Sequence, residues 1–546
     1  MRHGPRARAA ALTIMLALAS ACESPDATRD AREAETDEVA ATSQALVGAS
    51  TDVALAVPDA LRQAPFDAPR TLRVPAGFRA ALHARVPGAR FMTIDPDGQL
   101  LVSVPSRGTV LRVDASGRVS ELLRGLARPH DLVFHTMDGS TYLYVSEKNQ
   151  VRRYVYVRGA VSGAQTIVAG LPDASLSELR GAYGHELKNI AIGPGDRLYV
   201  SIASATNADP RDLDAEPKRG AIYAYPARGG AGTLLAQGIR NAEGLAIEPT
   251  TGALWVVVNN RDNIAYPFHR DWDGDGRDDY GRVMQSYVDG HPPEAFIRVR
   301  AGGNYGWPFC NPNPDQGLID MPYDRDVQNN ADGARLDCSR IDRVNRGIEA
   351  HAAPLGLSFL PTTGAALPAG YAGAAVSAYH GCWNCSRPAG YKVALFPFAN
   401  GAPTEEIELA TGFRAFGGRP VDVVASARGE LFISDDALGA IYKLTYAPAP
   451  EPTGRVCTSV GENGVATLTC PAGTRVQRIA FASYGTPTGS CGAWVRATCD
   501  APRSTRVVEG SCLGRASCSV LATNGTFGDP CPGVLKRLSI EASCAP

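Results

Sequence analysis

The sequence carries almost no net charge. Its 54 Lys and Arg residues nearly balance its 56 Asp and Glu residues, which leaves a formal net charge of -2 over 546 residues. Proteins that bind nucleic acids through the phosphates usually carry a strongly basic domain or stripe, and this balanced composition gives no sign of one. We therefore expect no nucleic-acid partner.

Aromatic residues and long apolar runs are also scarce. Aromatic residues make up 7% of the chain and hydrophobic residues 44%. The apolar run from Ala9 to Leu18 follows Arg2, Arg6 and Arg8, and it is shorter than the roughly 20 residues that a membrane-spanning helix needs. This pattern is typical of an export signal, which we predict over residues 1–22.

The end of the predicted signal resembles a lipidation site. The sequence ASAC, ending at Cys22, resembles a bacterial lipobox, in which Cys22 would carry the lipid and provide the only attachment to a membrane. Cleavage after Ala21 without lipidation is the alternative. Residues 23–69 show no strand pattern or sustained helix pattern, so we predict a flexible linker. The mature protein is expected in the cell envelope or outside the cell.

Cysteine placement agrees with export. Besides Cys22, the thirteen cysteines comprise a dense group of eight between residues 457 and 544 and four in the middle of the chain. The dense group predicts a disulfide framework, because a zinc site would need paired Cys or His ligands that the tail lacks. Cys382 and Cys385 have a redox-motif spacing but no βαβ context, so a structural bridge is favoured. The four in the middle are Cys310, Cys338, Cys382 and Cys385.

The middle of the chain repeats one pattern. Between residues 70 and 447 an apolar strand, a turn with Asp, Pro or Gly and a second strand recur, as expected from 57 glycines and 39 prolines. The six copies begin FMTIDPDGQLLVSV, LVFHTMDGSTYLYVS, IAIGPGDRLYVSI, LAIEPTTGALWVVV, LGLSFLPTTG and VDVVASARGELFISD. They predict a mainly β fold, a six-bladed β-propeller, over a β-sandwich. A proline-rich linker (448–455) and a second domain (456–546) follow.

Eight segments of this region carry a family resemblance. They are GHELKNIAIGPGDRLYVSI, GIRNAEGLAIEPTTGALW, NNRDN, PPE, GGNYGWPFC, HAAPLGLSF, HGCWNCSRPAGYKV and GRPVDVVASARGELFISDDALGAIYKLTY. In this order they resemble the sorbosone and glucose (aldose sugar) dehydrogenases, soluble six-bladed propellers that use pyrroloquinoline quinone. The resemblance spans residues 70–447 and depends on the order of the segments, since each segment alone is weak evidence.

The resemblance implies oxidation of a sugar's C1 hydroxyl to a lactone, in which a base removes the hydroxyl proton and the quinone accepts a hydride. His185 matches the catalytic base, and an imidazole titrates near the required pH. Most isolated histidines of this kind only cap a strand or bond to a turn, and the neighbouring motifs favour the base for His185. Arg240, Asn241 and Arg419 match residues that line the tricarboxylate cofactor, which needs cationic and amide donors.

The resemblance also implies a Ca2+ ion against the quinone oxygens, held partly by the backbone carbonyls of residues matching Asn260 and Arg261. These are backbone ligands, so the side chains at the two positions are free to vary.

Several residues depart from the family pattern. Asn384 falls where the glucose enzymes place a cofactor-binding lysine, and Arg387, close by in the chain, is a candidate to restore the charge. Val421 replaces the second arginine of an RxRD motif, and Ser204 replaces a carboxylate placed near the quinone. These changes remove charge from the expected cofactor site.

A second metal signal is independent of the resemblance. Residues 271–279 read DWDGDGRDD, which places carboxylates at positions 1, 3, 5 and 9 and glycine at position 6 of an EF-hand type loop. Position 12 is Arg282 in place of the usual glutamate, and a solvated acidic turn is the alternative. We predict a structural calcium ion here. The four carboxylates belong to Asp271, Asp273, Asp275 and Asp279.

The tail carries a second resemblance. IAFASYGTPTGSCG, SCLGRASCSV, FGDPCPGVLKRLSIEASC and the eight cysteines resemble the galactose- and rhamnose-binding lectin domain of sea-urchin egg lectin type. The resemblance implies a small disulfide-rich α/β domain. It also implies four bridges, Cys457–Cys491, Cys470–Cys544, Cys499–Cys531 and Cys512–Cys518.

The same resemblance implies the sugar-contacting residues of the lectin domain. Tyr484, Asp529 and Lys536 match such positions, and the glutamate of the family corresponds to Thr458 or, with a gap, to Glu462. A purely structural or adhesive domain is the alternative.

The sequence therefore predicts an exported quinone-dependent sugar dehydrogenase whose lectin domain binds glycans and whose electrons pass to a respiratory acceptor. One alternative is a non-catalytic carbohydrate-binding protein whose propeller has lost the cofactor. Another is a calcium-dependent lactonase or other hydrolase of propeller type.

Overall fold

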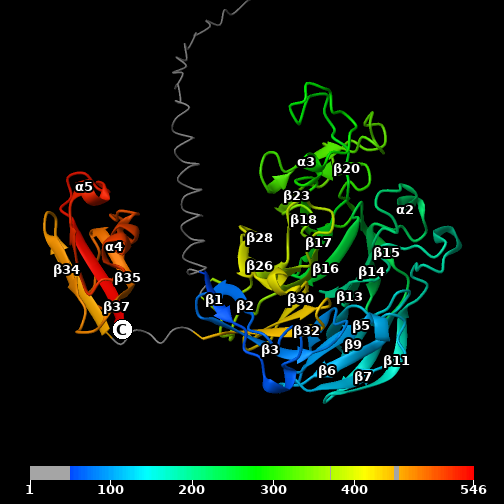
Figure 1. Cartoon of the computed structure of the whole chain (residues 1–546), viewed down its shortest axis with the longest axis horizontal. Helices are drawn as coiled ribbons and strands as arrows, with labels where there is room; N and C mark the ends of the chain where they lie inside the picture. The colour runs from blue at the N-terminus through cyan, green and yellow to red at the C-terminus, as the bar shows by residue number, and fades with distance from the viewer. Residues whose placement is uncertain (1–49, 369, 448–453, 546) are drawn as a thin grey trace, which may run out of the picture.

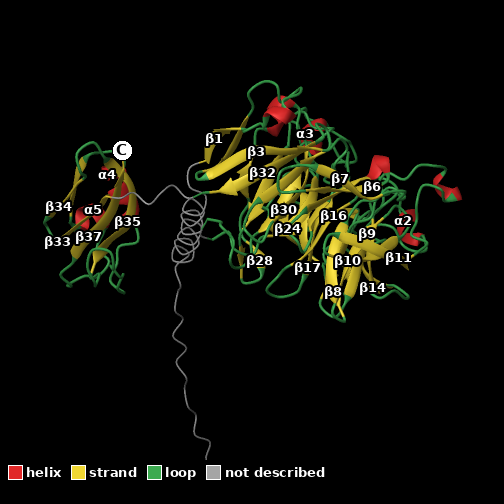
Figure 2. Cartoon of the chain, turned by 90° about the horizontal axis from the view of Figure 1, so that it is seen from below, coloured by secondary structure: helices red, strands yellow, loops and turns green. Residues whose placement is uncertain are grey.

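The computed structural model describes residues 50–368, 370–447 and 454–545. Strands dominate, and short helices lie in the connections between them (Figures 1 and 2). Within these ranges no helix is both long and apolar enough to cross a membrane. The predicted export signal, Cys22 and the linker up to residue 49 lie outside the described residues.

Six sheets, each built on four antiparallel strands, succeed one another in residues 78–446. The first sheet contains β4 (Met92–Ile94), β5 (Leu100–Val104), β6 (Thr109–Val113) and β7 (Val119–Leu123). The second contains β8 (Leu132–Met137), β9 (Ser140–Ser146), β10 (Val151–Val157) and β11 (Ala160–Val168). The third contains β12 (Ile190–Gly193), β13 (Arg197–Ile202), β14 (Ala221–Pro226) and β15 (Thr233–Gln237), with β19 (Gly303–Asn304) added in parallel.

The other three sheets follow the same plan. The fourth contains β16 (Asn241–Ile247), β17 (Leu254–Asn259), β18 (Glu294–Arg298), β23 (Val344–Ile348) and β21 (Ile319–Met321). The fifth contains β24 (Pro354–Phe359), β25 (Ala375–Tyr379), β26 (Lys392–Phe396) and β29 (Ile407–Ala410). The sixth contains β30 (Pro420–Ala425), β31 (Leu431–Asp435), β32 (Ala440–Tyr446) and β3 (Phe78–Arg85).

The sixth sheet joins the two ends of this domain. Its outer strand β3 comes from the start of the domain and pairs antiparallel with β32, with Leu82 opposite Tyr442. Because the remaining strands of the sheet come from the end of the domain, β3 links the first and last segments of the chain that form it. We call residues 71–447 the six-sheet domain.

One strand of each sheet, the innermost, faces a central cavity. These innermost strands, β4, β8, β12, β16, β24 and β30, each contact the next one in this order, and β30 contacts β4. Residues of all six line a cavity of about 630 Å³. Sheets arranged around a central cavity in this way are typical of a β-propeller.

The sequence pattern predicted the inner hairpins of the sheets. The turn between β12 and β13 is made by residues 194–196, in which Gly195 (φ 74°) and Asp196 (φ 53°) both adopt the left-handed conformation that such turns require. The outer strands were not predicted because they are exposed and lack apolar alternation. In β11, for example, only the last two residues are buried.

Residues 50–69 correct the predicted boundary of the flexible linker. β1 (Ser50–Ala54) pairs with β2 (Thr71–Pro75), and Leu55 and Phe66 are buried in the core beside the sixth sheet. The partner of β1 lies about 20 residues further along the chain, which is a non-local pairing that the local composition could not reveal. This segment is therefore folded against the six-sheet domain and is not part of a flexible linker.

Two insertions extend the fourth sheet and project from the six-sheet domain as the green loops of Figure 1. One joins β17 to β18 and contains α3 (Gln285–Val288). The other joins β18 to β23 and contains a two-stranded sheet of β20 (Cys310–Pro312) and β22 (Tyr323–Arg325) with a Cys310–Cys338 bridge. The remaining short elements are β27 (Phe398–Ala399), β28 (Ala402–Pro403), α2 (Arg211–Asp214), and the 3-10 helices η1 (Asp59–Leu61), η2 (Pro105–Arg107), η3 (Ser177–Leu179) and η4 (Phe413–Phe416).

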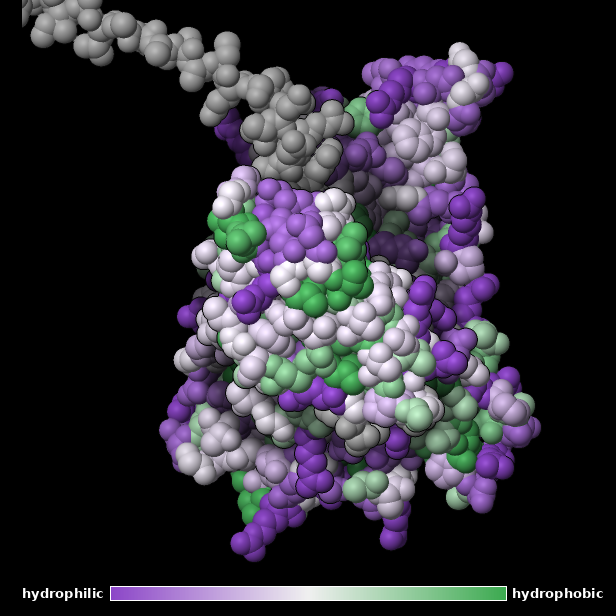
Figure 3. Space-filling view, turned by 90° about the vertical axis from the view of Figure 1, so that its left-hand side faces the viewer, coloured by the Kyte–Doolittle hydropathy of each residue, from purple (hydrophilic) through white to green (hydrophobic). Residues whose placement is uncertain are grey.

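The C-terminal domain is a small α/β unit with its own core. Its strands and helices are β33 (Gly454–Gly461), β34 (Val465–Thr469), β35 (Arg475–Gly485), β36 (Ser517–Leu521), β37 (Arg537–Ala545), α4 (Ser504–Cys512) and α5 (Asn524–Phe527). The four predicted bridges are confirmed: Cys457–Cys491, Cys470–Cys544, Cys499–Cys531 and Cys512–Cys518. Figure 3 shows a mostly polar face on which apolar side chains form small separate patches.

Removing the Leu82 side chain should destabilise the six-sheet domain, because Leu82 lies in the strand that closes the sixth sheet and is 1% exposed. We expect Leu82→Ala to lower the free energy of unfolding by about 3 kcal/mol, the usual cost of such a cavity. Denaturant unfolding followed by fluorescence measures this. Arg79→Ala, an exposed change in the same strand, is the control. Equal stability of the two variants would contradict the role of β3.

Candidate active site at the start of the innermost strands

A ring of cationic or imidazole side chains precedes the innermost strands. Each of these six strands is preceded by one such residue, within three positions of its first residue. Because the strands lie side by side around the cavity, the six side chains gather at the same end of the domain. This cationic ring consists of Arg90, His130, Lys188, Arg240, His351 and Arg419.

Carboxylates balance several members of the cationic ring. Arg240 Nη2 lies 2.9 Å from Asp262 Oδ2, and Arg90 Nη1 lies 2.8 Å from Asp436 Oδ2. Other pairs connect sheets that are not neighbours. The Nε2 atom of buried His130, before the second sheet, lies 3.3 Å from Glu243 Oε2 in the fourth sheet. The end of the domain is therefore rich in charge with little water around it.

His185 is held in one tautomer. Its Nδ1 lies 2.8 Å from the backbone oxygen of Ser204, an atom that can only accept a hydrogen bond. Nδ1 therefore carries the ring proton, and Nε2 is left unprotonated. Burial, with the positive charge of Arg240 next in importance, lowers the pKa of His185 to about 4. The ring is neutral at neutral pH and keeps partial exposure, so Nε2 can accept a proton.

Arg240 lies close enough to His185 for its charge to act on the imidazole, and Asn241 follows Arg240 at the start of β16. The backbone N–H of Ser204 donates to the Arg240 carbonyl at 2.7 Å, which joins the partner of His185 to Arg240. The Arg240 guanidinium donates to Asp262 and to Asn207 Oδ1 at 3.0 Å. Asn241 Nδ2 lies 3.2 Å from Glu243 Oε1. Burial lowers the pKa of Arg240, although Asp262 opposes the shift.

Arg419 reaches the same end of the domain from the sixth sheet. Its Nε donates to the His380 carbonyl at 3.0 Å and its Nη2 to the Gly381 carbonyl at 2.7 Å. His380 is linked in turn to Asp436, the carboxylate that pairs with Arg90, at 2.9 Å. Arg419 therefore holds the 380s loop against the cationic ring.

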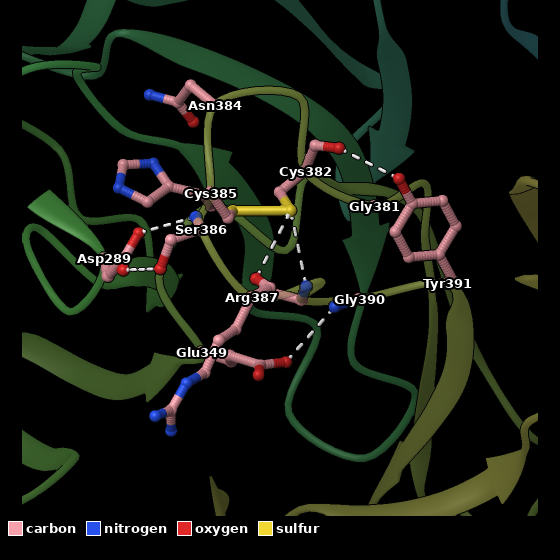
Figure 4. Close-up of a disulfide and its surroundings, with 12 residues drawn as sticks. Asp289, Glu349, Gly381, Cys382, Asn384, Cys385, Ser386, Arg387, Gly390 and Tyr391 are labelled. Carbon is pink, nitrogen blue, oxygen red and sulfur yellow. Dashed lines mark hydrogen bonds between the residues drawn. A yellow bond between two sulfur atoms is a disulfide. The ribbon is translucent and has the colours of Figure 1, made fainter. Parts of the chain in front are cut away.

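Asn384 and Arg387 point in different directions (Figure 4). Asn384 Nδ2 lies 3.5 Å from Asn263 Oδ1, next to Asp262, and its own Oδ1 is buried without a hydrogen-bond partner in the described part of the chain. The Arg387 side chain is exposed and extends away from Asn384. The structure thus does not bring the Arg387 guanidinium to the position where it would replace the missing lysine.

Val421 occupies the position where the family resemblance implies an arginine, and its surroundings are apolar. Its side chain is fully buried and packs with Phe91 and Leu355 at the start of three innermost strands. An apolar contact among three sheets therefore replaces the guanidinium at this point. Each such buried aliphatic side chain contributes about 1.5 to 3 kcal/mol relative to an exposed one.

The implied calcium ligands of the quinone site are placed next to Glu294. Asn260 Nδ2 donates to the Pro293 carbonyl at 2.7 Å, and the Arg261 guanidinium pairs with buried Asp326. Since both side chains are engaged with these partners, their backbone carbonyls are the atoms left for a metal. Burial raises the pKa of Glu294 to about 8, so this carboxyl is neutral at neutral pH.

The acidic loop brings together three of the four predicted carboxylates. Oxygens of Asp271, Asp273 and Asp275 lie within 4.8 Å of one another, and all three residues are exposed. Asp279 is instead buried, where its carboxylate accepts the Trp272 backbone N–H at 2.8 Å and pairs with Arg282. Arg282, at position 12 of the loop, thus keeps Asp279 apart from the other three carboxylates, because its guanidinium pairs with the Asp279 carboxylate.

The predicted lectin residues form one cluster. Lys536 Nζ lies 2.9 Å from Asp529 Oδ1 and 3.7 Å from Glu462 Oε1. Glu462 is therefore placed with the cluster, whereas Thr458 lies within β33 opposite Ile540. Tyr484 is fully buried and donates to Asn524 Oδ1 at 2.9 Å. Its hydroxyl lies near the cluster, because burial, with the charge of Glu462 next in importance, raises the pKa of Tyr484.

The sequence reasoning missed most members of the cationic ring and their carboxylate partners. Arg90, His130, Lys188 and His351 were not selected, nor were Asp262 and Glu243. Their common signal is position, since the missed cations all stand directly before a first strand of the repeat. Their carboxylate partners follow no such rule.

Comparison with known proteins begins with the tail. Residues 468–544 match the model of the D-galactoside/L-rhamnose binding SUEL lectin domain. Beta-galactosidase 8 of Arabidopsis thaliana is 45% identical over 82 residues, which are 15% of this chain and 10% of the relative. Beta-galactosidase 6 of Oryza sativa is 40% identical over 89 residues. The chain spans about a tenth of the length of these curated relatives.

The six-sheet domain has its own relatives. A calcium structure of Trichoderma reesei Carbohydrate-Active Enzymes Family AA12 is 24% identical with a TM-score of 0.55, covering 68% of this chain and 96% of that one. The holo form of the pyranose dehydrogenase PQQ domain from Coprinopsis cinerea is 20% identical with the same TM-score, covering 68% and 97%. These likenesses establish the fold as a β-propeller. The TrAA12-like family model matches residues 72–447, more than half of the sequence, and the chain therefore belongs to the TrAA12-like family.

Proposed function

We propose that this protein is an exported sugar dehydrogenase that oxidises the C1 hydroxyl of an aldose or related sugar to a lactone with pyrroloquinoline quinone. On this proposal the six sheets are the six blades of a propeller, and the cationic ring at one end is the cofactor site. The observation that carries the proposal is His185, whose free Nε2 stands beside Arg240 in that ring.

The donor set at this end of the domain fits an acidic, acceptor-rich cofactor. Arg90, Arg240 and Arg419 supply guanidinium groups, and Asn241 and Asn384 supply amides. Two buried nitrogens here, Arg90 Nε and His130 Nδ1, have no hydrogen-bond partner among the described residues. Buried polar groups are normally paired. Arg90 Nε lacks an acceptor, whereas His130 Nδ1 lacks a donor, because the ring proton of His130 is on Nε2, which faces the Glu243 carboxylate. The quinone, when bound, would supply the acceptor for the hydride.

The chain's own residues manage the proton. His185 Nε2 takes the proton of the sugar hydroxyl, while the Ser204 carbonyl holds the ring orientation through Nδ1. The imidazolium that forms is stabilised by the negative charges of Glu243 and Asp262, which oppose the effect of Arg240 on the pKa of His185. A low pKa returns the proton readily to water, so the base is restored for the next turnover.

Calcium is proposed at two places. The first is the cofactor site, where the Asn260 and Arg261 carbonyls would be ligands and the ion would polarise the quinone. The second is the acidic loop, where Asp271, Asp273 and Asp275 converge and an ion would offset their mutual repulsion. In that loop the ion would be structural.

The lectin domain would hold the enzyme near glycans through the cluster of Asp529, Lys536, Glu462 and the nearby Tyr484. The paired carboxylate and ammonium groups suit the hydroxyls of a sugar. Six disulfides support export, because such bridges persist in oxidising compartments. The lipid anchor at Cys22 and a respiratory electron acceptor complete the proposal.

A non-catalytic carbohydrate-binding protein is the second candidate. The apolar contact of Val421 with Phe91 and Leu355, and the outward direction of Arg387, both leave the site with fewer cations than the family pattern implies. If the remaining donors do not hold the quinone, the lectin domain is the functional part of the chain.

The dehydrogenase reaction is tested by dye reduction. The mature chain, supplied with pyrroloquinoline quinone and calcium, should reduce a dye in the presence of an aldose from a panel. We expect His185→Ala to lower kcat about 100-fold or more, because a general base contributes on this scale. His269→Ala, an exposed histidine of the first insertion, is the matched control and should keep full activity. Equal activity of both variants would rule out His185 as the base.

The pH profile follows from the lowered pKa of His185. A base must be unprotonated, so kcat/KM should stay level from neutral pH to about pH 5 and fall about tenfold per pH unit below about 4. Asp262→Asn removes a negative charge that raises this pKa and should move the acid limb lower still. An acid limb near the ordinary histidine value of 6.5 would contradict the arrangement.

Sugar binding by the tail is tested at Lys536. Lys536→Ala removes the ammonium between Asp529 and Glu462 and leaves two carboxylates that repel each other. We expect the variant to lose retention on galactose and rhamnose affinity columns. Arg537→Ala, at the exposed neighbour, should be retained like the parent protein. Unchanged retention of Lys536→Ala would place the sugar elsewhere.

A further inference from the structure

Trp383 is unusually exposed for its type. Of the five tryptophans in the chain it is the most accessible, at 73%, and the next large exposed one, Trp272, is 36% exposed and packed against Tyr266 and Tyr287. Exposed indoles are enriched at binding interfaces, because the ring offers a large apolar face together with a polar N–H.

The loop that carries Trp383 is fixed on both sides. Cys382 and Cys385 form a disulfide across the indole-bearing segment, with their Cα atoms 6.0 Å apart (Figure 4). Tyr391 Oη donates to the Cys382 carbonyl at 2.9 Å, and Ser386 N donates to Asp289 Oδ1 at 2.9 Å. Trp383 is thus exposed on a backbone that is held by these contacts. The conformational entropy lost on binding a ligand would come mainly from its side-chain rotamers.

The anchors of this loop place Trp383 at the rim of the cationic ring. On one side, the Gly381 carbonyl accepts from Arg419, a member of that ring. On the other side, Asn384 lies 3.5 Å from Asn263, which follows Asp262, the partner of Arg240. Trp383 lies in the chain between these two attachments, and its side chain is exposed to solvent. A ligand that extends out of the site would pass this rim.

We propose that Trp383 is a stacking platform for a second sugar ring, so that the site accepts an oligosaccharide whose reducing end reaches His185. This inference rests on the proposed function, since it assumes that a sugar occupies the site. The apolar face of a pyranose ring covers an indole, while its hydroxyls remain in water. The disulfide is a positioning element that presents the indole to that ring.

The chemistry of the rim favours a sugar over other occupants. Trp383 is a single exposed indole, and one side chain is too small an apolar area for a protein partner. The neighbouring groups are amides, hydroxyls and carboxylates, among them Asn384, Ser386 and Asp289. Such hydrogen-bonding groups around one aromatic face are the composition that a sugar ring requires.

The test measures binding without turnover. Dissociation constants for cellotriose, maltotriose and glucose are measured by calorimetry on the mature chain carrying Lys536→Ala, which silences the lectin cluster. We expect Trp383→Ala to weaken binding of a trisaccharide about tenfold, the loss expected from one aromatic contact, and to leave glucose binding unchanged. Trp383→Phe should lose less. Ile319→Ala, which removes an aliphatic side chain of β21 that is 63% exposed, should change nothing.

A double Cys382→Ser, Cys385→Ser variant tests the positioning role, and it should weaken trisaccharide binding while it leaves glucose binding unchanged. Equal trisaccharide constants for the parent and Trp383→Ala would overturn the proposal, as would no trisaccharide binding by the parent. So would an equal loss for glucose and trisaccharide. Because binding is read without quinone, failure of the dehydrogenase assay alone would overturn the proposed function and leave the stacking platform standing.

Discussion

The structure depends on the packing of six innermost strands around one cavity. Each strand contacts its two neighbours, and all six begin at the same end of the domain. A residue placed before any one of them therefore meets residues from sheets far away in the sequence, as His130 meets Glu243. The candidate site has no segment of its own in the chain and exists only when the ring of strands is complete. β3, which joins the first segment to the last sheet, helps complete it.

Electrostatic balance is the second constraint. The cationic ring gathers positive charge in a place with little water, where charges are costly unless they are paired. Asp262 and Asp436 pair with Arg240 and Arg90, while His185 responds to burial by staying neutral. The result combines fixed positive charge, suited to an acidic cofactor, with a neutral base beside it. The substitution at Val421 moves this balance toward apolar contact and reduces the charge available.

The features that could be predicted from the sequence are those that repeat along the chain or that depend on neighbouring residues. Inner hairpins such as β12–β13 followed from apolar alternation and turn residues, and the four bridges of the tail followed from the resemblance to a known lectin domain. The outer strands, the pairing of β1 and the closing role of β3 depend on partners far along the chain, so no local pattern carries them. Asp279 lies apart from the other three carboxylates because it pairs with Arg282, a contact that the spacing of the loop does not reveal. The outward direction of Arg387 depends on the backbone of the 380s loop.

On the proposed function, the two domains would combine two ways of holding sugar. The tail has the cluster of Asp529, Lys536 and Glu462 in a domain held by four disulfides. The propeller has the cationic ring with the Trp383 indole at its rim. Both would then depend on folding in an oxidising compartment, since the Cys382–Cys385 bridge and the bridges of the tail fix the loops that carry the proposed contacts.

The most direct measurement of the central claim is a calorimetric titration of the folded mature chain with pyrroloquinoline quinone in a buffer that contains calcium. The account predicts saturable binding of one quinone per chain, weakened strongly in Arg240→Ala and retained in His185→Ala. No saturable binding at micromolar quinone by a folded protein would contradict it. The cationic ring would then be a structural feature, and the lectin domain would be left as the functional part of the molecule.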